Sequence, residues 1–342
     1  MGREAAREAR TEGPPRVALI GVLALPLVGL AILILRPELD LEWQHQPSHF
    51  WLVLITAAVN VALAYLTNEA ANRRADARLI LVSLAFMLSA GFLGLHALAT
   101  PGILLPQSNA GFVIATPVGL ILASVMAAAS VSPLAGPRSS LVLRNRGLLR
   151  WGVIALLVAW GLASVLRLPP LSGPAPEQAD AWGAVAAFAA VALYALAAWR
   201  FLQIARRRRS AVALAVVAAF VLLAEAMIAV ALSRSWHLSW WEWHLLMTSA
   251  FALIALGTRA EYRRTGSLVA AFAPIYLGAT LARIDRWHGR AIADLAEAEA
   301  RGEPTDRLLA DLRSDGASSD ELRLMTEAAR EIRRVDELFR PY

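Results

Sequence analysis

Histidine is the residue type in this chain best suited to hold a metal ion or a haem. The sequence contains six histidines and no cysteine, so imidazole is the main ligand that it offers to zinc, copper or haem iron. Five of the six lie near the ends of long apolar stretches: His45, His49, His96, His237 and His244. We therefore predict a copper or zinc ion, or haem b, at one face of the protein, with His96 and His244 as the first pair of ligands.

A simpler interpretation of these histidines stays open, because polar rings at a membrane interface need no ligand. His45 and His49 form an i,i+4 pair only if their segment is helical, which Pro47 makes doubtful. His96 differs from the others, since it lies one turn inside an apolar stretch, where a polar ring needs a partner. The sixth histidine, His288, falls on the opposite side and is not part of the predicted site.

Two other polar residues interrupt apolar stretches, Glu225 and Asn60. A carboxylate within the hydrocarbon costs roughly 2.5–3.5 kcal/mol on insertion scales, so Glu225 must face other helices, be protonated or be paired. It is a partner of a ligating histidine, a proton carrier, or a structural hydrogen-bond partner of Asn60 or Thr56. The segment Thr100-Pro101-Gly102 is expected to end a helix.

The elements that must position these residues are membrane-spanning helices. Of the 342 residues, 58% are hydrophobic and 18% are charged, and the mean hydropathy is +0.52. An apolar stretch of roughly 17–25 residues spans the ~30 Å hydrocarbon core as a helix. About eight such stretches occur, at 17–35, 50–68, 79–99, 111–131, 150–166, 182–202, 211–232 and 244–258. The predicted fold is an all-α, multi-pass membrane bundle.

Arginine placement gives the orientation of this bundle. Arginines are frequent in the N-terminal tail and after the second, fourth, sixth and eighth stretches, whereas the alternate connections hold only Arg36, Arg167 and Arg234. By the positive-inside rule, both termini lie in the cytoplasm of a protein of the cell membrane, and the five clustered histidines lie outside. Tryptophans gather at that outer boundary, as is typical of an aromatic belt.

Composition excludes several classes of protein. All 33 of the Lys+Arg residues are arginine, so a retinal Schiff base, which needs a lysine amine, is impossible. The absence of cysteine excludes iron–sulfur clusters and covalently attached haem. The net charge of +6 comes from arginines in short runs between apolar stretches, so it reports topology rather than binding of nucleic acid.

The chain changes character after the eighth stretch. We predict a cytoplasmic tail at 1–16, a transmembrane domain at 17–264, amphipathic helices at 265–317 and a signalling helix at 318–342. Within the third segment, one helix is expected over 267–300 and a short one over 305–313. Ser318 and Glu321 form a capping box before the last helix, which places an apolar stripe at helical spacing, typical of a coiled coil: Leu322, Met325, Ala329, Ile332 and Phe339.

The last sixteen residues, EAAREIRRVDELFRPY at 327–342, resemble the linker before the catalytic domain of membrane-anchored class III adenylate/guanylate cyclases. In that family a helix ends in a Phe-x-x-Tyr segment at the domain entrance, and here Phe339 and Tyr342 match it. The resemblance implies a membrane and linker region that serves a cytoplasmic output domain, and a homodimer. No catalytic residue of the family matches this chain, so the chain as given is not expected to be an enzyme.

Three functions follow from these observations. The first is a membrane sensor that detects a ligand at the outer face or in the membrane and transmits through 265–342. The second is a redox protein with haem or copper at the outer histidines, although the inner half lacks a matching histidine pair. The third is a transporter, which would favour several intramembrane charges and inverted repeats.

Overall fold

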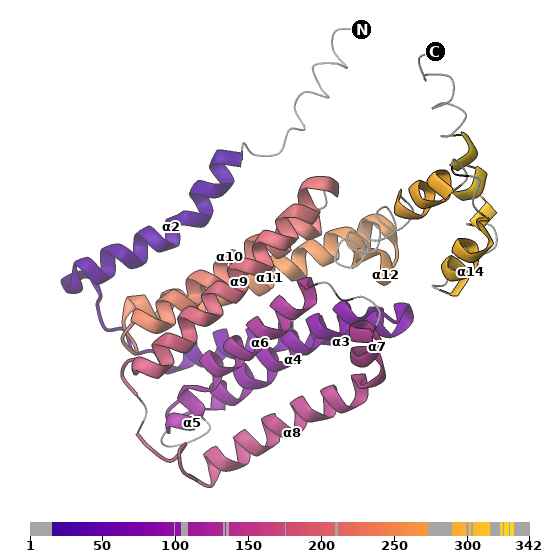
Figure 1. Cartoon of the computed structure of the whole chain (residues 1–342). Coiled ribbons are helices and arrows are strands. Elements are labelled where there is room, and N and C mark those ends of the chain that lie inside the picture. Colours follow the sequence, from indigo (N-terminus) through magenta and orange to yellow (C-terminus); the bar gives the residue numbers. More distant parts are fainter. Residues whose placement is uncertain are drawn as a thin grey trace. The chain divides into compact units, whose positions relative to one another are not determined.

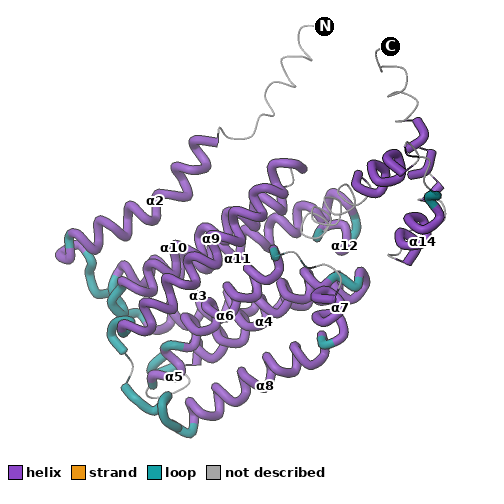
Figure 2. Tube along the Cα trace, viewed as in Figure 1, coloured by secondary structure: helices purple, strands orange, loops and turns teal. Residues whose placement is uncertain are grey.

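The computed structural model describes residues 16–98, 100–103, 109–132, 134, 137–174, 176–208, 211–272, 289–298, 301, 304–314, 322–323, 325–327 and 329–331. Within these ranges the chain is all-helical, and the β-type pairing found there is an isolated bridge between Glu42 and His237 (Figure 2). The chain divides into two compact units, Met1–Tyr276 and Leu277–Tyr342.

Each of the eight apolar stretches predicted from the sequence coincides with a helix. The long helices of the first unit are α2 (Arg16–Leu35), α3 (Gln46–Arg74), α4 (Ala77–Leu98), α6 (Ala115–Val131), α8 (Arg146–Val165), α9 (Ala181–Arg208), α10 (Ala211–Leu232) and α11 (Leu238–Thr265). Shorter elements join them: η2 (Pro37–Leu39), α5 (Ala110–Val113), α7 (Pro137–Arg144) and α12 (Leu268–Ala271). A turn at Ile114 separates α5 from α6 within the fourth stretch.

Five of the described helices are long and apolar enough to cross a membrane, namely α3, α4, α8, α9 and α10. Two more, α2 and α6, are apolar but shorter over their described residues. Helix α11 is long but begins with Trp240-Trp241-Glu242-Trp243-His244 and ends with a charged turn. These helices indicate a lipid bilayer as the surroundings of the protein, and eight crossings remain a prediction.

Six helices of the first unit pack in a closed order, α3 on α4, α4 on α6, α6 on α9, α9 on α10, α10 on α11, and α11 back on α3. Helix α8 lies along the edge, against α4 and α5, and α2 lies on α10 and α11 (Figure 1). The apolar window of α4 is 72% buried and that of α8 only 6%, so α4 is central and α8 presents most of its surface to lipid. Helix α4 carries His96.

Glycines allow the close approach of α6 to α4. A Cβ added at Gly119 would lie 2.5 Å from the Cβ of Phe92, and Phe92 is fully buried. Phe92 also packs edge-on against Trp160 of α8, with ring centroids 5.4 Å apart. The missing side chain at Gly119 therefore sets the spacing of the helix that positions His96.

The second unit contains helical residues 289–298, α14 (Asp306–Ser314) and helical residues between 322 and 331. Ala291, Leu295, Met325 and Ala329 form its buried cluster, with Leu308, Leu309 and Leu312 packed against them. The stripe expected to face a partner chain is thus covered by the same chain at Met325 and Ala329, and Leu322 is also buried. A dimer through this stripe would need the unit to open.

Some predicted features of this region differ from the structure or lie outside it. The single helix expected over 267–300 is broken, because α12 ends at Ala271 and Phe272 caps it. The first compact unit extends to Tyr276, and the predicted limit of the transmembrane domain at 264 stays a prediction. His288, Ile332, Phe339 and the capping box at 318–321 lie outside the described residues.

Candidate metal centre

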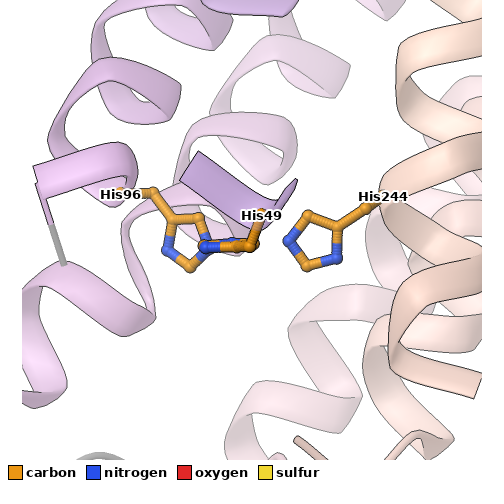
Figure 3. Close-up of side chains that lie close together, drawn as sticks. All are labelled: His49, His96 and His244. Atoms are coloured by element: carbon orange, nitrogen blue, oxygen red, sulfur yellow. The ribbon is translucent and has the colours of Figure 1, made fainter. Parts of the chain in front are cut away.

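Three histidines from three helices converge in the first unit: His49 of α3, His96 of α4 and His244 of α11 (Figure 3). One ligand nitrogen from each ring lies within 4.8 Å of the other two, and the Nε2 atoms of His49 and His96 are 3.2 Å apart. The ring centroids of His96 and His244 are 5.8 Å apart. All three side chains are buried, with at most 3% exposed.

The second nitrogen of each ring already has a partner. The Nδ1 of His96 lies 3.0 Å from the carbonyl oxygen of Phe112, and the Nδ1 of His244 lies 3.0 Å from that of Trp240. A carbonyl only accepts, so both Nδ1 atoms carry the proton and both Nε2 atoms present a lone pair. The Nδ1 of His49 is 2.8 Å from the hydroxyl of Thr100. Metal-binding histidines in proteins are oriented by such outer partners.

A hydrogen bond between the rings of His49 and His96 leaves the ring of His244 without a partner at its Nε2. His49 can donate from Nε2 to His96 if Thr100 donates to its Nδ1, and this arrangement pairs both rings. The Nε2 of His244 remains buried with no hydrogen-bond partner among the described residues. A buried polar atom without a partner costs about 1–3 kcal/mol, so a ligand at this nitrogen would stabilise the cluster.

The spacing fits a transition metal better than it fits a haem. Tetrahedral Zn–N bonds of about 2.0–2.1 Å place ligand nitrogens roughly 3.3 Å apart, which the His49–His96 pair already matches. The other distances between ligand nitrogens are up to 4.8 Å. These distances would have to shorten for a metal ion to bind. A porphyrin between His96 and His244 would need the space into which His49 projects, as Figure 3 shows.

Contacts of the segments that precede α3 and α11 hold both helices at this point. His45 caps α3, accepting from the backbone N–H of Ser48 at 3.3 Å, and Pro47 occupies the first turn, where a missing N–H costs nothing. The doubt raised by Pro47 was therefore wrong, because this proline starts the helix rather than breaking it. Asp40 caps α11, since it accepts from the N–H and the hydroxyl of Ser239 at 2.8 and 2.9 Å.

Indole rings enclose the three histidines. Trp240 and Trp243 lie against His244, with centroids 4.1 and 3.5 Å apart, and Trp240 also lies 5.0 Å from His49. Trp236 adopts a left-handed backbone conformation, with φ of 64°, and its carbonyl accepts from the N–H of Trp43 at 2.7 Å. Such backbone strain is often found at functional sites.

A cavity of about 380 Å³ opens beside the centre, and His49 and His96 form part of its wall. Residues of the segments between helices complete it, including Glu42, Thr100, Glu177, Arg234, Ser235 and Trp236. Glu177 and Arg234 form an ion pair at 2.9 Å. The centre is therefore buried in the bundle but borders a space that is lined by polar and charged groups.

The remaining predicted site residues lie outside the three-histidine cluster. His45 is exposed and stacks on Trp43, whereas His237 lines the cavity and has its Nδ1 near the carbonyl of Ser235 at 3.0 Å. Asn60 is buried and donates to the carbonyl of Thr56 at 2.9 Å.

Glu225 is buried, and its Oε2 lacks a partner among the described residues. The nearby group that acts on it electrostatically is Glu242 of α11, not Asn60 or Thr56 as the sequence suggested. Glu225 of α10 thus lies near Glu242 of α11 and outside the histidine cluster.

Thr100 is the site residue that the sequence analysis assigned only to a helix end. A threonine two residues beyond the end of a helix, and four beyond a buried histidine, carries no distinctive signal.

Comparisons with protein-family models, with curated proteins and with solved structures give no match to this chain. The interpretation of the centre therefore depends on its own geometry.

Proposed function

We propose that this chain is a membrane sensor module whose ligand is a transition-metal ion, zinc or copper, bound by His49, His96 and His244. One observation carries the proposal: three buried Nε2 atoms converge while every Nδ1 has an outer partner. Three imidazoles without thiolates suit zinc and copper. Haem is the weaker candidate, because His49 takes up the space that a porphyrin would need.

The sensory part of the proposal combines this centre with the topology predicted from the sequence. Eight crossings with both termini in the cytoplasm would put the histidines at the outer face. The helices of the second unit would then pass the signal to an output domain, and the resemblance of residues 327–342 favours a class III cyclase that works as a homodimer. In this proposal a metal ion would change the relative positions of α3, α4 and α11, because each helix supplies one ligand.

The metal content of the purified chain in lipid nanodiscs tests the proposal. After incubation with zinc or copper and removal of the excess, we expect about one ion per chain. His49→Ala, His96→Ala and His244→Ala should each abolish stable binding. His45→Asn, which can keep the helix cap, and His237→Ala are matched controls from the same outer face and should retain the ion. Wild-type protein that retains no more metal than a variant lacking all three histidines would refute the proposal.

A copper redox protein is the second candidate, since the same three imidazoles suit copper and indole rings pack against His49 and His244. A reversible one-electron change of bound copper, followed by paramagnetic resonance, distinguishes it from a sensor that binds zinc alone. The transporter alternative gains no support from the described residues.

A further inference from the structure

The cavity beside the centre bears on how many ligands a bound ion would have. Three protein ligands leave one position open in a tetrahedral site, which is the arrangement of catalytic rather than structural zinc. In the described residues the three histidines form the only group of potential ligands close enough together to share an ion. His49 and His96 lie in the wall of the cavity of about 380 Å³, whereas His244 is fully buried behind them.

We propose, on the basis of the metal-sensor function above, that a small anion enters this cavity and binds the metal at its fourth position. The centre would then detect the ion together with an external ligand, and not the ion alone. Drug-sized ligand sites begin at about 300 Å³, so the cavity is large enough for a small anion and several waters.

The charges around the cavity favour an anion as its occupant. A divalent ion bound by three neutral imidazoles keeps both of its positive charges. Arg234 and Glu177 form an ion pair and cancel, and Glu42 supplies one negative charge. One positive charge remains, and a monoanion at the open position neutralises it. Neutral donors such as water compete without this electrostatic gain.

Cobalt(II) is a suitable probe, because its visible absorption reports coordination number and ligand type in a site that suits zinc. The full chain is loaded with cobalt in nanodiscs and titrated with sodium azide, a small monoanion with a nitrogen donor. We expect a saturable change in the visible bands, with one azide per cobalt. Sodium perchlorate, a weakly coordinating anion, controls for ionic strength and should leave the bands unchanged.

Variants of the cavity wall separate binding at this site from binding elsewhere. Ser235→Trp places an indole in the cavity and should abolish the response to azide while cobalt still binds. Ser235→Ala is its matched control and should respond like the wild type. Glu42→Gln should strengthen azide binding and Arg234→Gln should weaken it, each by about two- to fivefold, because each variant shifts the local charge by one unit at several ångströms from the metal.

The outcomes distinguish this inference from the function on which it rests. A chain that retains none of zinc, copper and cobalt would refute both. A chain that binds cobalt through the three histidines, but whose spectrum azide leaves unchanged, would overturn the open position alone. An azide response that persists in Ser235→Trp and ignores both charge variants would also overturn it.

Discussion

At the scale of single residues, the candidate centre depends on which nitrogen of each imidazole carries a proton. The carbonyl oxygens of Phe112 and Trp240 fix the Nδ1–H form of His96 and His244. Thr100 is the adjustable partner, since its hydroxyl can donate to His49 or accept from it. When Thr100 accepts, three lone pairs face one another, which is favourable only with a cation between them.

Thr100→Val removes this hydroxyl at nearly constant volume and should weaken metal binding by roughly 10–100-fold, the usual cost of losing an outer partner of a ligating histidine. The loss arises because the His49 ring is no longer held with its Nε2 toward the centre. Competition with a metal-binding dye measures the affinity. Thr116→Val is the control: Thr116 is equally buried, and its hydroxyl has no partner among the described residues. Equal affinities for the two variants would contradict this role of Thr100.

The sequence identified the three histidines and predicted that they lie on one side of the membrane. It did not predict that all three would form one cluster. His96 and His244 were paired because both lie near outer helix ends, and the structure places their rings together. His49 was among the five candidates but outside the first pair, and Pro47 made a helical His45/His49 pair doubtful, although a proline in the first turn is compatible with a helix. The contact of His49 with Thr100 joins two helices and is set by tertiary packing, which local sequence does not encode.

At the scale of elements, the position of the centre depends on how closely α4 packs on its neighbours. Helix α4 is the most buried of the candidate spans. Its contact with α6 is close because Gly119 has no side chain where it meets Phe92. Overpacking a dense core typically costs 1–3 kcal/mol, so this position offers a test of the packing.

Gly119→Ala should lower the free energy of unfolding by about 1–3 kcal/mol, because buried Phe92 cannot move away from the added methyl group. Gly94→Ala, in α4 itself, is the matched control: nothing lies within 4 Å of its added Cβ, and alanine favours a helix over glycine by roughly 0.5–1 kcal/mol. Unfolding in detergent, followed by tryptophan fluorescence, gives both values. A free energy of unfolding for Gly119→Ala as high as that of Gly94→Ala would contradict the packing of α4 on α6.

The helices themselves were predictable, because apolar length alone marks a span and every predicted stretch coincides with a helix. Their ends were less predictable. Asp40 caps α11 from a segment 199 residues earlier in the chain, a contact that no local pattern signals. The break of α12 after Ala271 was missed, since helical spacing of apolar residues continues past it in the sequence.

At the scale of the whole molecule, the distribution of arginine predicts the membrane topology. The arginine-rich connections alternate with connections that contain at most one arginine, and the histidine centre belongs to the arginine-poor side. The second unit buries Met325 and Ala329 in its own cluster. In the proposed sensor, transmission through this unit would combine release of this cluster with pairing of two chains.

Reporter fusions test the topology directly. Reporters placed after residues 140, 209 or 264 should be active in the cytoplasm, because arginine-rich connections stay inside. Reporters after residues 46, 106, 175 or 238 should be active outside. A pair with reversed behaviour would contradict the eight-crossing arrangement and would move the histidine centre to the other face.

The first coordination shell of a bound ion tests the central claim most directly. X-ray absorption fine structure of the zinc-loaded chain in nanodiscs should show three imidazole nitrogens at about 2.0–2.1 Å, with the outer-ring scattering that histidine produces. The fourth ligand should be a light atom. A shell made only of oxygen ligands, or one that is unchanged when His49, His96 and His244 are all replaced by alanine, would contradict the three-histidine centre.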